Sequence, residues 1–184
     1  MKRVAATALL LLNLSVLAST QTLKHFPVAP QYTDRKVLIH LESLENQLKA
    51  VRKSTFKVSF YGWSNPDVGA AAEKTWGTAS TLMEGTISRI EDIRAAGSYS
   101  IGSLFQVYTT ASNINGNAVS LAYGVSMFKK KDAELYAEIL GDSNDLALSL
   151  LDIENDISFV LNLEGDMLLT LESIPSCKVK VTEQ

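Results

Sequence analysis

Apolar residues recur at steps of three and four along most of the chain, which is the period of an amphipathic helix. The first stripe follows Thr33-Asp34, either of which can cap a helix, and it comprises Val37, Leu41, Leu44, Leu48 and Val51. It leads into an aromatic cluster that includes Phe56, Phe60, Tyr61 and Trp63. The pattern predicts a helix that begins at Thr33 or Asp34 and ends before Ser64-Asn65-Pro66.

The next two stripes predict two further long helices. Asn65 suits the N-cap and Pro66 the first turn of the second helix, whose stripe runs to Ile93 before Gly97. The third helix is expected from about Ser100 to Lys131. Within it, residues 113–117 read Asn-Ile-Asn-Gly-Asn, and because Asn and Gly weaken a helix interior we expect a kink or short break there.

A fourth helix is expected from Asp132, with a stripe that reaches Ile157 and a bend at Gly141-Asp142. A shorter fifth helix is expected over residues 161–174, ended by Pro175. Long amphipathic segments with short connections predict an all-α fold, an antiparallel four- to five-helix bundle.

The ends of the chain differ from this pattern. Residues 1–18 combine Lys2 and Arg3 with an apolar stretch and a small residue, Ala18, at the expected cleavage point, which predicts a secretory signal peptide. Residues 19–33 are expected to form an irregular N-terminal arm, 34–175 the helical bundle domain and 176–184 a C-terminal tail. The chain is therefore expected to be secreted and to lack a transmembrane segment.

Charge limits the classes of binding partner, and the cysteine content limits how the fold can be stabilised. Loss of Lys2 and Arg3 with the signal changes the formal net charge from −3 to −5, which argues against nucleic acid as the main partner. The single cysteine, Cys177, excludes an internal disulfide, and whether it pairs between chains is left open. Helix packing, rather than cross-linking, must therefore stabilise the fold.

The chain offers little material for catalysis or metal binding. It has two histidines, His25 and His40, too few for a zinc site of ordinary composition. The acidic run that starts at Asp142 lacks the spacing of an EF-hand loop, because Ala147 stands where the loop needs glycine. We expect no metal and no cofactor, and the sequence identifies no catalytic residue.

Aromatic residues on or near the inward stripes are the candidate ligand-binding set. The same stripes contain small or polar residues such as Thr75, Ala111, Ala118 and Gly124, which would leave space between the helices. This combination predicts a hydrophobic central cavity, in which tyrosine hydroxyls could orient the polar head of a ligand. The candidate ligand-binding residues are Phe60, Trp63, Trp76, Met83, Phe105, Tyr108, Tyr123 and Phe128.

Several segments together resemble the fungal hydrophobic-surface-binding protein A family, which includes cell-wall galactomannoproteins. The resemblance covers about residues 32–174 and is carried by the helix 37–48, the Phe60-Tyr61-Gly62 segment, and the basic run 129–131 before the helix 133–157. It implies a secreted helical domain with a hydrophobic central cavity that binds lipids or hydrophobic surfaces. The chain lacks the Ser/Thr-rich tail of the wall mannoproteins, which argues against wall attachment.

Three functions remain open from the sequence. The first is a secreted bundle that binds a lipid or another hydrophobic small molecule in its core. The second is a cofactor-free cyclase or isomerase of a hydrophobic natural product, with Tyr108 or Tyr123 assisting proton transfer. The third is a surface-active protein of the cell wall or an antigen.

Overall fold

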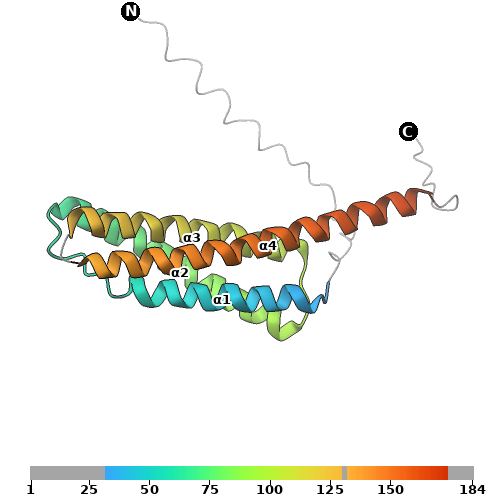
Figure 1. Cartoon of the computed structure of the whole chain (residues 1–184). Helices are drawn as coiled ribbons and strands as arrows, with labels where there is room; N and C mark the ends of the chain where they lie inside the picture. The colour runs from blue at the N-terminus through green and yellow to red at the C-terminus, as the bar shows by residue number, and fades with distance from the viewer. Residues whose placement is uncertain (1–31, 130–131, 174–184) are drawn as a thin grey trace, which may run out of the picture.

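The protein forms a bundle of four long helices in the residues that the computed structural model describes, which are 32–129 and 132–173, with side chains described as far as residue 164. The helices are α1 (Arg35–Thr55), α2 (Pro66–Ala96), α3 (Ile101–Phe128) and α4 (Ala133–Ser173). Each helix packs on the one before it, and α4 also packs on α1, which closes the bundle (Figure 1). The predicted signal peptide, most of the N-terminal arm and Cys177 lie outside the described residues.

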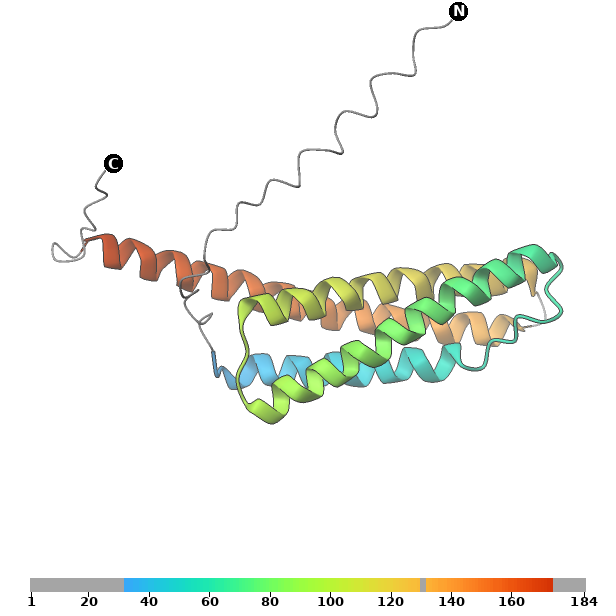
Figure 2. The same cartoon turned by 180° about the vertical axis from the view of Figure 1, so that it is seen from behind.

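The starts of α1 and α2 follow the predicted capping chemistry. The Asp34 carboxylate accepts a hydrogen bond from the Lys36 backbone N–H, and the Asn65 side chain accepts from the N–H groups of Asp67 and Val68. Gly97 ends α2 with a φ of 64°, a left-handed conformation that glycine adopts without steric cost. Figure 2 shows α2 running obliquely across the face formed by α1 and α3.

The expected break at residues 113–117 is wrong, because α3 is helical throughout this segment. Ala111, Ile114 and Ala118 are fully buried there, so core packing outweighs the low helix propensity of the asparagines. The Asn117 amide also donates to the Asn113 carbonyl oxygen at 2.8 Å, which satisfies the side chain along the helix. The helix ends at Phe128, three residues before the expected end.

The prediction of a separate fifth helix is also wrong. Residues 133–173 form the single helix α4, which passes Gly141 without interruption and extends beyond the ends of the other helices (Figures 1 and 2). A continuous buried stripe that includes Ile139, Leu146, Ile153 and Val160 keeps α4 against α1 and α3. None of the helices in the described part of the chain combines the length and apolarity needed to cross a membrane.

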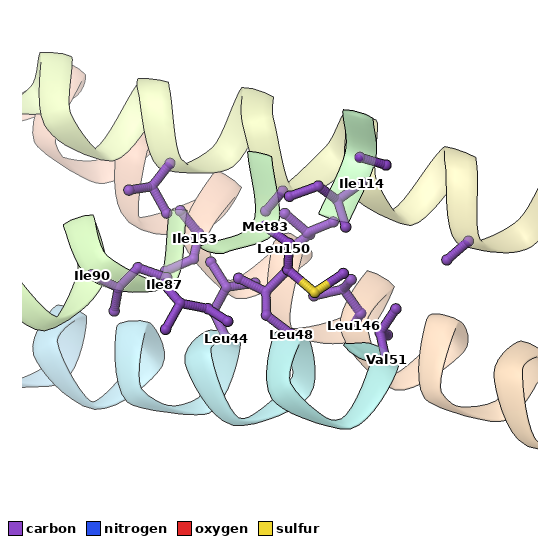
Figure 3. Close-up of a cluster of buried hydrophobic side chains, with 14 of the residues drawn as sticks. Leu44, Leu48, Val51, Met83, Ile87, Ile90, Ile114, Leu146, Leu150 and Ile153 are labelled. Carbon is purple, nitrogen blue, oxygen red and sulfur yellow. The ribbon is translucent and has the colours of Figure 1, made fainter. Parts of the chain in front are cut away.

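Side chains from all four helices fill the middle of the bundle (Figure 3). Leu48, Met83, Ile114 and Leu146, one from each helix, are 0% exposed. A side chain with no accessible surface borders no space large enough for a water molecule, so the core is close-packed at this level. Open hollows in the described residues lie at the surface instead, one between α2 and α3 and another over the loop 58–63 and the start of α2.

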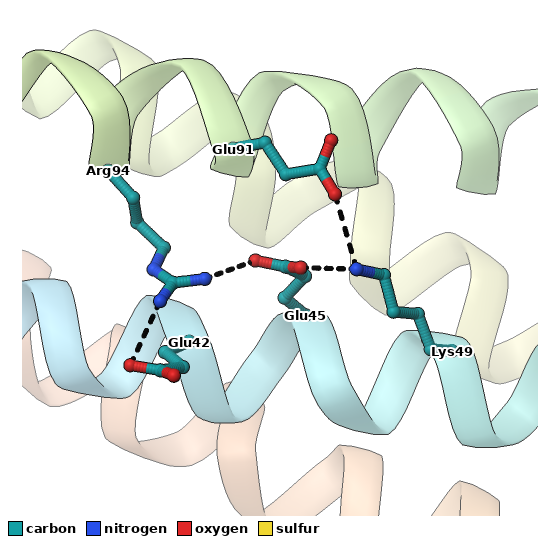
Figure 4. A network of polar contacts seen from close by, with 5 residues as sticks. All are labelled: Glu42, Glu45, Lys49, Glu91 and Arg94. Atoms are coloured by element: carbon teal, nitrogen blue, oxygen red, sulfur yellow. Dashed lines mark hydrogen bonds and ion pairs between the residues drawn. The ribbon is translucent and has the colours of Figure 1, made fainter.

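A buried carboxylate joins α1 to α2 (Figure 4). Glu45 on α1 accepts from Arg94 of α2 at 2.6 Å and from Lys49, while Arg94 also pairs with Glu42 at 2.9 Å. Lys49 reaches Glu91 on α2 at 3.2 Å. Burial alone would raise the pKa of Glu45, but the hydrogen bonds from Lys49 and Arg94 hold that pKa below its ordinary value.

Candidate functional site

Trp63 anchors the loop between α1 and α2 against the end of α3. Its ring stacks with both Phe60 and Phe128, with centroid distances of 6.0 Å and 6.1 Å. The indole Nε1 donates to the Ser59 carbonyl oxygen at 2.9 Å, so the polar atom of this 4% exposed side chain is satisfied. The ring therefore has little freedom to move.

Two glycines allow the Trp63 ring to lie this close to the helices. A Cβ atom at Gly69 on α2 would lie 2.9 Å from the Phe60 carbonyl oxygen and 3.3 Å from the Trp63 Cβ. A Cβ at Gly124 on α3 would lie 3.0 Å from Cη2 of Trp63. The absence of a side chain at both positions is thus what admits the ring between α2 and α3.

An apolar hollow of about 520 Å³ lies beside this ring. We call it the α2–α3 groove, because apart from Trp63 all its lining residues belong to these two helices. Several of them, including Ala71, Tyr123 and Met127, are exposed, so the groove is open to solvent. Its lining comprises Trp63, Val68, Ala71, Ala72, Thr75, Trp76, Asn117, Ser120, Leu121, Tyr123, Gly124, Met127 and Phe128.

The two ends of the groove differ in chemistry. Because α2 and α3 run in opposite directions, the start of α2 lies beside the end of α3 at one end of the groove. Trp63, Val68 and Phe128 lie at the end of the bundle, next to the aromatic stack. Thr75, Asn117 and Ser120 lie farther along both helices, towards the middle of the bundle. An apolar end and a hydroxyl- and amide-bearing end are what an amphiphilic ligand requires.

The polar residues of the groove retain capacity to bond a ligand. The Ser120 hydroxyl donates to the Gly116 carbonyl oxygen at 2.8 Å, which leaves its oxygen able to accept. The Asn117 amide nitrogen donates to Asn113, which leaves its side-chain oxygen as an acceptor. Of the described lining residues, Tyr123 alone carries an ionisable side chain.

Four of the eight predicted ligand-binding residues line this one groove: Trp63, Trp76, Tyr123 and Phe128. Phe60 stacks on Trp63 but does not line the groove. Tyr123, expected to face inward, is instead 51% exposed at the rim, beside Tyr136 of α4. Binding by these residues remains a prediction, but the structure brings half of them together.

The other three predicted residues lie away from the groove. Met83 belongs to the close-packed core, and Phe105 is 59% exposed, so its expected inward orientation is wrong. The Tyr108 hydroxyl donates to Glu154 on α4 at 3.3 Å, and burial together with this carboxylate raises the pKa of Tyr108. Phe105 and Tyr108 therefore lie on α3 away from the groove, and Met83 lies in the core on α2.

Sequence reasoning missed several residues of the groove, chiefly Ala71, Asn117, Ser120 and Met127. Asn117 was assigned to a helix break, and the others stand outside the apolar stripes. Their helical spacing does carry a signal, since Asn117, Ser120 and Gly124 recur at steps of three and four and form a small-residue face of α3. Only the packing of α2 beside this face shows that it borders the groove.

A second polar cluster lies between α1 and α4. His40 Nδ1 lies 2.7 Å from Oδ2 of Asp156, and burial raises the pKa of Asp156 against the opposing effect of His40. On the same two helices, the hydroxyl oxygens of Ser43 and Ser149 lie 3.2 Å apart and form a hydrogen bond. Among the described contacts, neither hydroxyl bonds to His40. No serine nucleophile is therefore paired with this histidine, and the described residues hold no cluster of three or more metal-binding side chains.

Comparison of the chain with protein-family models, with curated proteins and with solved structures yields no match. The case for a function therefore comes from the groove itself.

Proposed function

We propose that the protein is a secreted helical bundle that binds a lipid or another hydrophobic small molecule in the α2–α3 groove. One observation carries the proposal: an open apolar hollow of about 520 Å³ with an aromatic end and a hydrogen-bonding end. Pockets for small organic ligands have volumes of about 300–1,000 Å³ and are mostly apolar with a few placed polar groups. Each CH₂ group buried there would contribute about 0.8 kcal/mol.

In this proposal, the hydrophobic central cavity expected from the sequence forms only when a ligand is bound. The face of α3 towards α2 carries Asn117, Ser120 and Gly124, which are smaller or more polar than the leucine and isoleucine side chains of the core. A ligand longer than the groove would extend towards the bundle axis by separating α2 from α3. Membership of the hydrophobic-surface-binding protein A family would fit such a bundle.

The groove supports binding better than catalysis. Acid–base catalysis needs a titratable group within reach of the reacting atom. The Tyr123 phenol is the single such group among the described lining residues. We therefore place passive binding ahead of a cyclase or isomerase activity.

Tryptophan fluorescence provides a direct test, because the chain has two tryptophans and both line the groove. Titration with the apolar dye N-phenyl-1-naphthylamine should quench their emission saturably by energy transfer to bound dye. The variant Ala71→Phe places a ring in the groove from an exposed position and should weaken binding by about tenfold or more, which corresponds to about 1.4 kcal/mol.

The matched control is Ala147→Phe, the same substitution at an exposed position of α4 outside the groove. It should bind the dye like the wild type. Equal weakening by both variants, or no saturable quenching in the wild-type protein, would count against the proposal.

A further inference from the structure

None of the described residues that line the groove carries a charged side chain. Lys129 follows Phe128 directly, but its ammonium group is already committed. It donates to the Ser59 carbonyl oxygen at 2.9 Å and pairs with Asp132 at 3.1 Å. Lys74 precedes Thr75 on α2 and is exposed, outside the lining.

A lining without charge should bind ligands with charged head groups more weakly than ligands with neutral head groups. A carboxylate that gives up part of its hydration at a site without a cation is disfavoured relative to a hydroxyl group, even where the site stays open to solvent. The polar residues that face the groove, Thr75, Asn117 and Ser120, carry neutral dipoles. The hydroxyls of Thr75 and Ser120 lie on helices that offer carbonyl acceptors four residues earlier, and that of Ser120 already uses one. The lining thus offers neutral donors, such as the Tyr123 hydroxyl, as well as acceptors, but no charged group, which suits a hydroxyl group on the ligand.

We propose that the ligand of the α2–α3 groove is a neutral amphiphile with a hydroxyl head, such as a terpenoid or fatty alcohol, rather than a fatty acid anion. This inference rests on the proposed function and specifies its ligand class. The hydroxyl lies at the Thr75–Asn117–Ser120 end and donates to a side-chain oxygen there. The apolar body lies along Trp76 towards Trp63 and Phe128.

Retinol and retinoate form a matched pair of probes, because they share one polyene body and differ in the head group. Both absorb where tryptophan emits, so each quenches Trp63 and Trp76 on binding. At pH 8 we expect retinol to bind at least about tenfold more tightly than retinoate, a difference of about 1.4 kcal/mol. Equal affinities, or tighter binding of retinoate, would overturn the inference and leave the proposed function standing. Failure of both probes and of the naphthylamine dye would overturn the proposed function itself.

A charge introduced into the groove provides a second, independent test. Ser120→Lys places an ammonium group at the polar end from an exposed position of α3, so the fold should tolerate it. Retinoate affinity should then rise by about tenfold or more, since the carboxylate gains a partner. Ser112→Lys makes the same change at an exposed position of α3 outside the groove and should leave retinoate binding unchanged. An equal gain in both variants would indicate non-specific attraction and contradict the inference.

Discussion

The edge of the Trp63 ring lies against the backbone of Gly124, so close that a Cβ atom there would be 3.0 Å from Cη2 and 3.1 Å from Cζ3 of the ring. This contact joins the loop after α1 to the last turns of α3. It also defines one end of the α2–α3 groove. The stack with Phe60 and Phe128, together with the hydrogen bond to Ser59, prevents the ring from retreating.

Gly124→Ala should therefore destabilise the protein by about 1–3 kcal/mol, as overpacking does in a close-packed core. Gly116→Ala is the matched control on the same helix, because nothing lies within 4 Å of a Cβ at that position. It should stabilise the protein by about 0.5–1 kcal/mol through helix propensity. Urea unfolding followed by circular dichroism measures both changes. If both variants gained stability, Trp63 would not be held as described.

The buried carboxylate of Glu45 makes a pH-dependent contribution to stability. Its pKa is lowered in the folded state, so the stabilisation is complete above the ordinary glutamate pKa and is lost as the pH falls through the lowered value. Glu45→Gln should cost about 1.5–3 kcal/mol at pH 7, as for hydrogen bonds to charged groups. The difference from the wild type should shrink as the pH falls below 4.5, which unfolding curves at several pH values would show.

Glu91→Gln is the control for this network. The Glu91 side chain is 53% exposed and, among the described residues, pairs with Lys49 alone, so its loss should cost less than about 1 kcal/mol. A cost equal to that of Glu45→Gln would mean that burial does not distinguish the two carboxylates.

Two tyrosines near the junction between α2 and α3 should lose their protons only at high pH. Tyr32 and Tyr99 are stacked at 5.9 Å, and each has a pKa raised to about 12. A hydrogen bond to Glu164 is the main cause for Tyr32, and burial is the main cause for Tyr99. Because both pKa values are raised in the folded state, their stabilisation is present at neutral pH and is lost as the pH rises towards 12.

Absorbance at 295 nm during alkaline titration would detect these two groups. Tyr32→Phe and Tyr99→Phe should each remove part of the component near pH 12. A titration without any component near pH 12 would contradict the described contacts.

The starts of α1 and α2 were predictable because capping depends on a few neighbouring residues, such as Asp34 and Asn65. The continuity of α3 was not, because the burial of Ile114 depends on helices distant in sequence. Local propensity predicts a break at residues 113–117, and tertiary packing prevents it.

The candidate site was predictable in part for the same reason. Trp63, Trp76 and Phe128 were found as aromatic residues near apolar stripes, and they do meet in one groove. The outward positions of Phe105 and Tyr123 depend on how α3 is rotated against its neighbours, which the spacing of apolar residues does not specify. The role of Gly124 becomes visible only once Trp63 lies against it.

The most direct test of the account is a crystal structure of the protein with retinol bound. The account predicts ligand density between α2 and α3, with the polyene beside Trp76 and the hydroxyl group near Asn117 and Ser120. Density on an outer face of α4, or an empty groove in crystals grown at a saturating retinol concentration, would contradict it.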